Sequence, residues 1–194
     1  CNILTQLYPD VPSVFGGIAA SMRRLTHYDY WSDRLMPSIL VDSQADILVY
    51  GMGEKQIVEI AKRLDSIPLQ SNNVVSNNSL ESIPQIAYIS NEEAIQLGSN
   101  VIHLASHEAA VKSKRVHAEN FRLIETESNK IHAATIVQPV GERYIVVNPP
   151  YPTMSTEELD AIYNLPFQYH PHPKYKDKHI PAYEMIRFSV CMHR

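Results

Sequence analysis

Two glycine turns stand at matching positions near the start of the sequence, each between a short apolar run and a helix-like run. Val14-Phe15 leads into the first turn, and Ile47–Tyr50 leads into the second. A glycine turn at a helix N-terminus lets the backbone approach a phosphate. Neither turn has the spacing G-x-G-x-x-G, so plain strand-to-helix turn geometry is the alternative. The predicted cofactor-binding residues are Gly16, Gly17, Gly51 and Gly53.

Histidine is the next residue type that could do chemistry, because imidazoles bind metal ions. Among nine histidines, His103 and His107 stand four apart, and His170 and His172 flank a proline. Two such histidines on a helix can bind zinc. However, His103 precedes the predicted helix, and no H-E-x-x-H pattern occurs. Neither pair has a third ligand nearby, so we predict solvated or hydrogen-bonded imidazoles and no metal ligand, with a structural zinc as the alternative.

The sequence contains few cysteines that could bind a cluster, act as a nucleophile or form disulfides. The sequence has two cysteines, Cys1 and Cys191, whereas a protein-held iron–sulfur cluster typically takes three or four thiolates. There is no G-x-S-x-G nucleophile pattern, and Cys191 is interpreted as a small apolar residue in a strand. We therefore predict no catalytic residue in this chain. Two cysteines also argue against a disulfide framework and fit a reducing, cytoplasmic environment.

The run HYDYWSDR, from His27 to Arg34, is too polar for a core and too aromatic for a disordered loop. In one interpretation it is a tight cap, in which the three aromatic rings pack and the two aspartates bond to the backbone or to Arg34. In the other interpretation it contacts a ligand or another domain, since exposed aromatic residues on loops serve this purpose. The sequence leaves both open.

The glycine turns must be positioned by strands and helices, which hydrophobic periodicity predicts. Ser13–Phe15 and Asp46–Tyr50 are predicted as neighbouring parallel strands, because the second has a continuous apolar run typical of a strand buried on both faces. Glu54–Leu64 is predicted as a helix packed on that sheet. Its apolar face is assigned to Ile57, Ile60, Ala61 and Leu64.

Later elements follow from the same patterns and from capping residues. Strand alternation, capping boxes and turn residues are the features used. The predicted elements are a possible edge strand at Val74-Val75, a strand at Ile86–Ile89, a short helix opened by Ser90 and Glu93, a mostly exposed helix at His107–Glu125, a hairpin of Ile131–Gln138 and Tyr144–Asn148, a helix opened by Ser155 and Glu158, and a strand at Glu184–Met192.

Composition is that of an ordinary globular protein, with 44% hydrophobic and 20% charged residues among 194. The net charge of −4 implies no general nucleic-acid affinity. No apolar stretch approaches the ~18 residues of a membrane span, so no membrane partner is predicted. The sequence begins at Cys1 without a methionine or a signal-like segment. We expect it to be part of a longer protein.

Two blocks of the sequence resemble the YgiQ-type radical SAM proteins. The first is GGIAASMRRLTHYDYWSDR followed by SILVDSQADILVYGMGE. The second is VNPPYPTMSTEELDAIYNLP, then HPHPKY, then IPAYEMIRFSVCMHR. The resemblance implies an α/β fold with a partial Rossmann-like, cobalamin-binding-like parallel sheet. It implies that residues 1–65 complete that domain, that 66–180 form an α+β connecting region with a hairpin, and that 181–194 are the first strand of a radical SAM barrel.

In the parent protein the resemblance implies a four-iron four-sulfur cluster that binds S-adenosylmethionine and cleaves it reductively to start radical chemistry. The cluster cysteines would follow Arg194, so this chain alone is expected to hold no cofactor and to be inactive. The D-x-H-x-x-G motif of cobalamin-binding proteins is absent, which leaves cobalamin binding in doubt. The alternative function is a non-catalytic Rossmann-like ligand-binding or assembly module. The substrate stays open, and self-association through an exposed strand at 184–192 is a further expectation.

Overall fold

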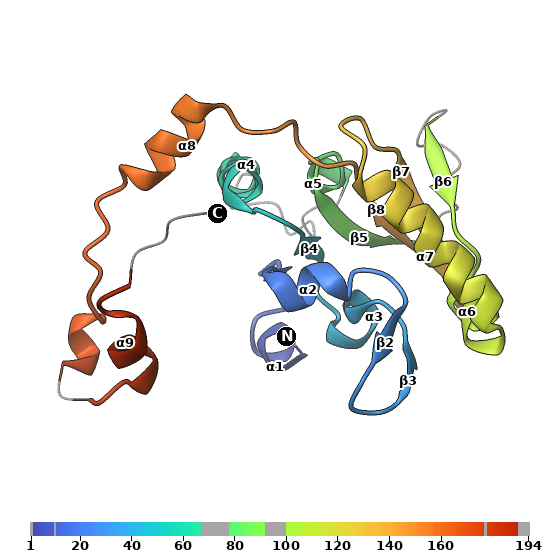
Figure 1. Ribbon diagram of the computed structural model, residues 1–194, viewed down its shortest axis with the longest axis horizontal. Coiled ribbons are helices and arrows are strands. Elements are labelled where there is room, and N and C mark those ends of the chain that lie inside the picture. Colours follow the sequence, from blue (N-terminus) through green and yellow to red (C-terminus); the bar gives the residue numbers. More distant parts are fainter. Residues whose placement is uncertain (1, 10, 67–77, 92–99, 177, 190–194) are drawn as a thin grey trace. The chain divides into compact units, whose positions relative to one another are not determined.

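The computed structural model describes residues 2–9, 11–66, 78–91, 100–176 and 178–189. The chain divides into two compact units, unit 1 (Cys1–Pro152) and unit 2 (Thr153–Arg194). Figure 1 shows their helices and strands in sequence colours. The boundary predicted near residue 65 falls inside unit 1, whose sheet contains strands from both sides of it.

Unit 1 is built on a mixed six-stranded sheet, which confirms the α/β class. The strand order is β1-β4-β5-β8-β7-β6. The β1–β4 and β6–β7 pairs are parallel, and the three pairs between them are antiparallel. The strands are β1 (Val14–Phe15), β4 (Ile47–Val49), β5 (Ile86–Ser90), β6 (Val101–His103), β7 (Thr135–Val140) and β8 (Arg143–Val147).

The predicted parallel neighbours are confirmed, with Val14 opposite Ile47 and Phe15 opposite Leu48. All three residues of β4 are buried, as expected for a strand with neighbours on both sides and helices on both faces. Side chains on successive strand positions point to opposite faces, so Leu48 belongs to one core cluster and its two neighbours belong to the other.

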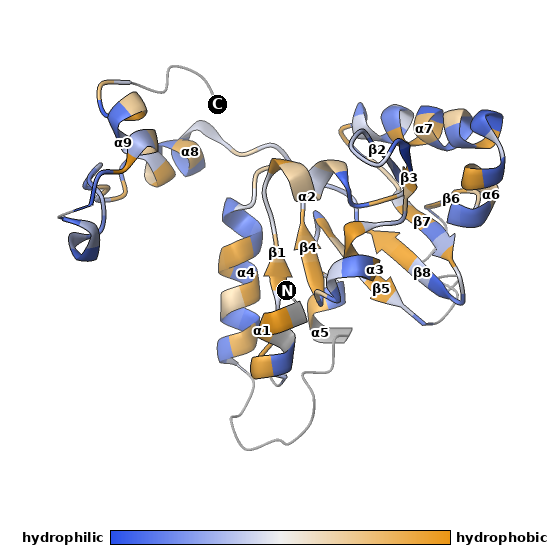
Figure 2. Cartoon of the chain, turned by 90° about the horizontal axis from the view of Figure 1, so that it is seen from below, coloured by the Kyte–Doolittle hydropathy of each residue, from blue (hydrophilic) through white to orange (hydrophobic). Residues whose placement is uncertain are grey.

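Helices cover both faces of the sheet. Leu48, Ala87 and Ile145 form the first cluster with Leu25 and Leu40. Ile47, Val49 and Val146 form the second with Ile60 and Leu80. In Figure 2, β4 and β5 are coloured mainly as hydrophobic residues. The helices of unit 1 are α1 (Asn2–Leu7), α2 (Ile18–Met22), α3 (Ile39–Ser43), α4 (Glu54–Asp65), α5 (Asn78–Glu81), α6 (His107–Lys112) and α7 (Lys114–Ser128).

Helix α4 packs on the sheet as predicted, but the predicted helix face is wrong in phase. Ile57 and Ala61 are exposed, whereas Gln56 and Ile60 are buried and Leu64 packs against the second cluster. These three positions are four residues apart and therefore share one face of the helix. The prediction from hydrophobic periodicity failed because it treated Gln56, a polar residue, as exposed to solvent, although Gln56 lies on the buried face.

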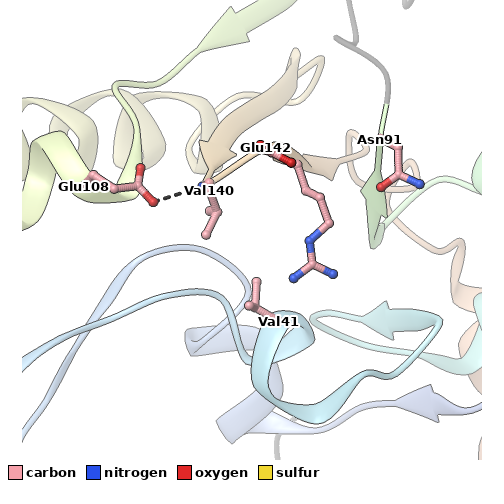
Figure 3. A pocket seen from close by; sticks show the side chains of 7 residues that line it. Val41, Asn91, Glu108, Val140 and Glu142 are labelled. Carbon is pink, nitrogen blue, oxygen red and sulfur yellow. Dashed lines mark hydrogen bonds between the residues drawn. The ribbon is translucent and has the colours of Figure 1, made fainter.

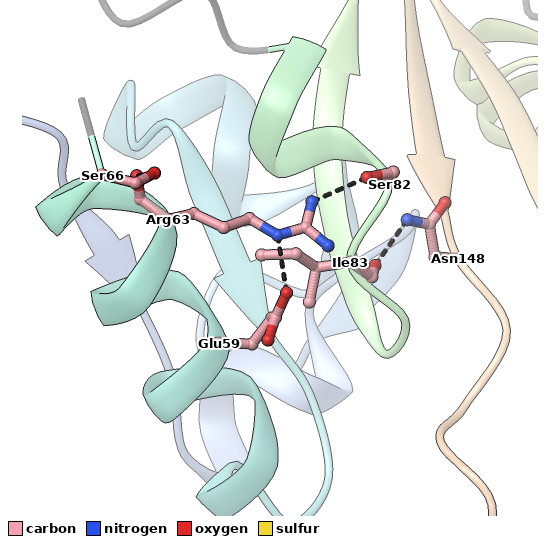
Figure 4. A network of polar contacts seen from close by, with 6 residues as sticks. All are labelled: Glu59, Arg63, Ser66, Ser82, Ile83 and Asn148. Atoms are coloured by element: carbon pink, nitrogen blue, oxygen red, sulfur yellow. Dashed lines mark hydrogen bonds and ion pairs between the residues drawn. The ribbon is translucent and has the colours of Figure 1, made fainter.

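A polar network fixes α4 to the segment before β5 (Figure 4). Arg63 donates from Nε to Glu59 Oε1 at 2.7 Å and from Nη1 to Ser82 Oγ at 2.7 Å. Asn148, which follows β8, donates to the backbone oxygen of Ile83 at 2.7 Å. These bonds join α4, the α5–β5 connection and the end of β8, so three separate segments form one block.

The predicted hairpin and long helix are found with changed bounds. Strands β7 and β8 pair antiparallel around a two-residue turn in which Gly141 has a φ of 60°. The predicted helix at His107–Glu125 is two helices, α6 and α7, divided at Ser113. That residue is extended, with φ −145° and ψ 114°, and its Oγ accepts from the N–H of Val116. A serine favours such a cap over a helix interior.

Unit 2 contains α8 (Thr156–Tyr163), a 3₁₀ helix (Pro173–Tyr175) and α9 (Pro181–Ile186). The predicted capping box is confirmed, because Ser155 and Glu158 exchange both of its hydrogen bonds. None of these three helices has a buried residue.

The strand predicted at Glu184–Met192 is wrong over the part of it that the structure describes. Residues 184–186 end α9, which begins with Pro181 at a position where helices favour proline. Arg187 pairs with Glu184 at 3.1 Å, three residues apart as on a helix. The alternation of apolar residues misled the prediction, and the open strand edge expected to drive self-association is absent over these residues.

Several predictions lie outside the described residues and stay predictions. They concern Val74-Val75, Glu93, and residues 190–194 with Cys191 and Arg194. Among the residues that the structure describes, no helix is both long and apolar enough to cross a membrane.

Glu127 fixes the connection between α7 and β7 although it is a buried carboxylate, only 3% exposed. Its Oε2 accepts from the N–H of Ala134 at 2.9 Å, and its Oε1 accepts from Lys130 Nζ at 2.5 Å. The bond from Lys130, followed by that from Ala134, lowers the pKa of Glu127, and burial opposes this only in part.

We expect this carboxylate to make unit 1 acid-sensitive. A carboxyl group whose pKa is lower in the folded than in the unfolded state contributes stability above its ordinary pKa of about 4.3 and loses it as the pH falls through the folded value. Urea unfolding at pH 7 and at pH values below the ordinary pKa should show a smaller acid-dependent loss in Glu127→Gln than in the native chain. Glu119→Gln is the control. The bond from Arg122 also lowers the pKa of Glu119, but both side chains are exposed, so this variant should keep nearly the acid-dependent loss of the native chain. Equal pH profiles for Glu127→Gln and the native chain would contradict this role.

Candidate functional site

The four predicted glycines lie at one edge of the sheet, where the parallel strands β1 and β4 both end. Gly16 and Gly17 follow β1, and Gly17 is the N-cap of α2 with a φ of 93°. Gly51 follows β4 with a φ of 67°, and Gly53 is the N-cap of α4. The two turns are close together, since a Cβ at Gly16 would lie 3.9 Å from the backbone oxygen of Val49.

A serine joins the two turns. The N–H of Gly51 donates to Ser21 Oγ at 3.0 Å, and that hydroxyl donates to the backbone oxygen of Gly17 at 2.9 Å. The backbone donor that Gly51 would offer to a phosphate is therefore bonded within the protein. The predicted role of the glycines in cofactor binding stays a prediction, while turn geometry accounts for the conformation of Gly17 and Gly51.

Gln85 closes this edge from the other side of β4. Its Nε2 donates to the backbone oxygens of Tyr50 at 2.8 Å and Met52 at 2.9 Å. Its Oε1 accepts from the N–H of Tyr151 at 3.1 Å, and its own N–H donates to Pro149 at 2.8 Å. The side chain thus joins the β4–α4 turn to the segment after β8. Sequence analysis did not single out this residue, because nothing in its neighbourhood marks a glutamine as a bridge.

Two cations at this edge have a described aromatic partner, Arg24 and Lys55, and the Nζ of Lys55 lies 6.0 Å from the ring centre of Tyr151. Arg24 is the closer of the two to its ring. Its guanidinium lies 5.0 Å from the ring centre of Tyr50, and its Nη1 donates to the backbone oxygen of Ser21 at 2.6 Å. Burial lowers the pKa of Arg24. Burial also raises the pKa of Tyr50 to about 12, although the charge of Arg24 acts in the opposite direction. Neither group exchanges protons near neutral pH, so the edge is suited to binding rather than to acid–base catalysis.

Both histidine pairs lie in the described part of the chain, where no group of three His, Cys, Asp or Glu residues is arranged to hold a metal ion. His103 is exposed, whereas His107 Nδ1 lies 3.1 Å from Thr26 Oγ1. His170 Nδ1 lies 3.0 Å from the hydroxyl of Tyr183, and His172 Nδ1 accepts from the N–H of Lys174. For these last three histidines, the prediction of hydrogen-bonded imidazoles is confirmed.

An open pocket of about 680 Å³ lies at the opposite edge of the sheet, beside the β7–β8 turn (Figure 3). Val41, Val140 and Glu142 contribute to its lining. Glu108 Oε1 accepts from the N–H of Gly141 at 2.9 Å. Burial disfavours ionisation of Glu108, but its hydrogen bonds outweigh this and lower its pKa. The pocket was not predicted, because it joins α3, α6 and the hairpin turn, which are distant in sequence.

The run from His27 to Arg34 forms a hairpin of β2 (His27–Asp29) and β3 (Arg34–Met36). The cap interpretation is right for Asp29, whose Oδ2 accepts from the N–H and Oγ of Ser32. Asp33 differs from it, because within the described hairpin Asp33 Oδ1 accepts from the hydroxyl of Tyr28 and not from the backbone or Arg34. The interpretation is wrong for the rings of Tyr28, Tyr30 and Trp31, which are exposed rather than packed.

Comparison with known proteins defines the class. The chain matches the family model described as Radical SAM N-terminal over residues 1–189, and it therefore belongs to this family. No solved structure matches it.

Three similar proteins are all described as UPF0313 proteins. A UPF0313 protein of Bacteroides thetaiotaomicron is 50% identical over the whole of this chain and 32% of its own length. One of Porphyromonas gingivalis is 51% identical over the whole chain and 30% of its length. One of Bradyrhizobium diazoefficiens is 37% identical over 97% of the chain and 30% of its length. The chain thus spans about a third of the length of these relatives.

The close approach of Gln85 to Gly51 predicts that a side chain at Gly51 destabilises the protein, and Gly141 is the matched control position. A Cβ at Gly51 would lie 2.9 Å from Gln85 Nε2, whereas a Cβ at Gly141 would meet nothing within 4 Å; both glycines have positive φ. Gly141→Ala should lower the free energy of unfolding by about 1–2 kcal/mol through backbone strain alone. Gly51→Ala should cost about 1–3 kcal/mol more, because Gln85 must move and loses hydrogen bonds. Urea unfolding measures both, and equal losses would contradict the contact.

Proposed function

We propose that this chain is the N-terminal, non-catalytic part of a cytoplasmic radical SAM enzyme. In the whole protein, a four-iron four-sulfur cluster would bind S-adenosylmethionine and cleave it reductively to start radical chemistry. The observation that carries the proposal is the family match over residues 1–189. The greater length of the relatives leaves room for a catalytic part of about twice the size of this chain.

The residues of this chain do not fit the cluster itself. A cluster needs several thiolates close together, and the sequence has only Cys1 and Cys191. The described residues also contain no group of three possible ligands. We therefore place the cluster ligands elsewhere in the whole protein and assign no chemical step to a residue of this chain.

The role left to this chain is to support the catalytic part. We propose that residues 1–65 belong to a cobalamin-binding-like domain, that residues 66–180 connect it to the barrel, and that residues 181–194 lead towards the barrel. The bonds of Gln85 and Asn148 tie residues on both sides of position 65 into unit 1 and fix the segment by which the chain leaves the sheet, which supports a structural role for this chain. Cobalamin is not part of the proposal, since its D-x-H-x-x-G motif is absent from the sequence.

The alternative is a non-catalytic ligand-binding or assembly module. The observation in its favour is that two glycine turns and the cation Arg24 gather at one sheet edge. A C-x-x-x-C-x-x-C run in the rest of the encoded protein would favour the enzyme, and its absence would favour the module.

We expect the whole protein, reconstituted anaerobically with iron and sulfide, to bind a stoichiometric cluster. With dithionite and S-adenosylmethionine it should then release 5′-deoxyadenosine and methionine. Iron analysis and chromatography of the products measure this. The 194-residue chain treated in the same way should form neither a cluster nor 5′-deoxyadenosine.

Two outcomes would count against the proposal. A whole protein that binds the cluster yet never cleaves S-adenosylmethionine would contradict the enzyme assignment. A stoichiometric cluster on the 194-residue chain would contradict the division of roles. Replacing the cluster cysteines of the whole protein by alanine is the control and should abolish both cluster and product.

A further inference from the structure

The β2–β3 hairpin presents large aromatic side chains to solvent. Tyr28 is 54% exposed, Tyr30 is 77% exposed and Trp31 is 88% exposed. Among the described aromatic side chains of unit 1, Trp31 and Tyr30 are the two most exposed. Their rings are in edge-to-face contact, with centres 5.7 Å apart. Exposed apolar groups of this size are unfavourable in water and mark interaction sites when they are gathered at one place.

The tip of the hairpin is held in one conformation. Asp29 Oδ2 accepts from the N–H of Ser32 at 2.9 Å and from its hydroxyl at 2.6 Å. The hydroxyl of Tyr28 donates to Asp33 at 2.6 Å, across the turn. Because the turn is ordered by its own bonds, a partner that binds the rings loses little conformational entropy in ordering them.

The base of the hairpin is fixed to the sheet. The N–H of Thr26 donates to Gln138 Oε1 on β7 at 2.9 Å, and Leu25 is buried in the first core cluster. After β3, the N–H of Ile39 donates to the backbone oxygen of Arg23 at 2.9 Å. In Figure 1 the hairpin extends away from the six-stranded sheet. The rings therefore stand on a rigid support, unlike those of a loose surface loop.

We propose that this aromatic hairpin tip, Tyr28–Trp31, is the docking surface by which unit 1 binds the catalytic part of the same polypeptide. The inference rests on the proposed function, in which this chain is one part of a longer enzyme. The occupant is an apolar pocket of that part with a hydrogen-bond acceptor at its end, because the rings of Tyr30 and Trp31 carry their donors at the ring edge, whereas the hydroxyl of Tyr28 is bonded to Asp33. Rigid Trp and Tyr side chains are the residue types that dominate binding energy at interfaces.

The size of the relatives favours this occupant. Proteins that match the whole chain at 50% and 51% identity are about three times as long as it is, so two thirds of each lies outside the matched region. Asp29 and Asp33 both accept hydrogen bonds from within the hairpin, and the rings of Tyr30 and Trp31 are the large apolar groups that it presents.

Photo-cross-linking in the whole protein tests the proposal. Trp31 is replaced by p-benzoylphenylalanine, and Tyr30 is replaced in a second variant in case the first fails to fold. Ile131, 82% exposed in the same unit, is the matched control position. After irradiation we expect a cross-linked monomer in which peptides of this hairpin are joined to peptides outside these 194 residues. The Ile131 variant should give no such product.

Other outcomes would overturn the inference. Cross-links to a second copy would make the hairpin an interface between copies, and cross-links absent or equal to the control would show that no docking occurs. Release of 5′-deoxyadenosine is measured on the same variants. Cleavage without the cross-link defeats the docking alone, whereas the cross-link without cleavage defeats the enzyme assignment alone.

Discussion

Gln85 holds together three segments that are far apart in the sequence. Its side chain bonds to the turn after β4 and to Tyr151 after β8, and its backbone bonds to Tyr50 and Pro149. Its own backbone has a φ of 61°, a left-handed conformation that costs a residue with a side chain about 1–3 kcal/mol. Five hydrogen bonds offset that cost, so the conformation persists because the surroundings fix it.

The sheet edge depends on this constraint. A Cβ at Gly51 would lie only 2.9 Å from Gln85 Nε2, which disfavours a side chain at this position. The N–H of Gly51 bonds to Ser21 next to the first glycine turn. Arg24 then rests on the ring of Tyr50, whose hydroxyl donates to the backbone oxygen of Asn148. Both glycine turns, the cation and the exit of the chain from the sheet are thus joined to one another by short polar contacts, in addition to the apolar packing of Phe15 and Tyr50 against the first core cluster.

The sequence predicted the features that depend on local patterns. The apolar run at Asp46–Tyr50, the helix that follows Gly53, the hairpin of β7 and β8, and the capping box at Ser155 all occur in the structure. The strand predicted at Glu184–Met192 failed over its described residues because two local signals conflicted. Alternation of apolar residues indicated a strand, but Pro181 at the helix start and an ion pair within one helical turn favour a helix over residues 181–186.

In the candidate site, residues marked by a local sequence pattern were predicted, and residues whose role depends on the order of the strands were missed. The four glycines were found from their positions between strand and helix, and the parallel pairing of β1 and β4 brings them together. Ser21, Arg24 and Gln85 were missed, because their roles follow from the sheet order rather than from their neighbours in sequence. The family resemblance, carried by motifs at both ends of the chain, was confirmed over residues 1–189.

Amide hydrogen exchange in Gln85→Ala tests the constraint most directly, because one residue provides two kinds of bond. The N–H of Tyr151 donates to the side chain, whereas the N–H of Tyr50 donates to the backbone oxygen of Gln85. In the variant, exchange at Tyr151 should become about fivefold faster, since the lost bond is worth about 1 kcal/mol. Exchange at Tyr50 should stay slow as the internal control. Unchanged exchange at Tyr151 would contradict the account, because the segment after β8 would then be held without Gln85.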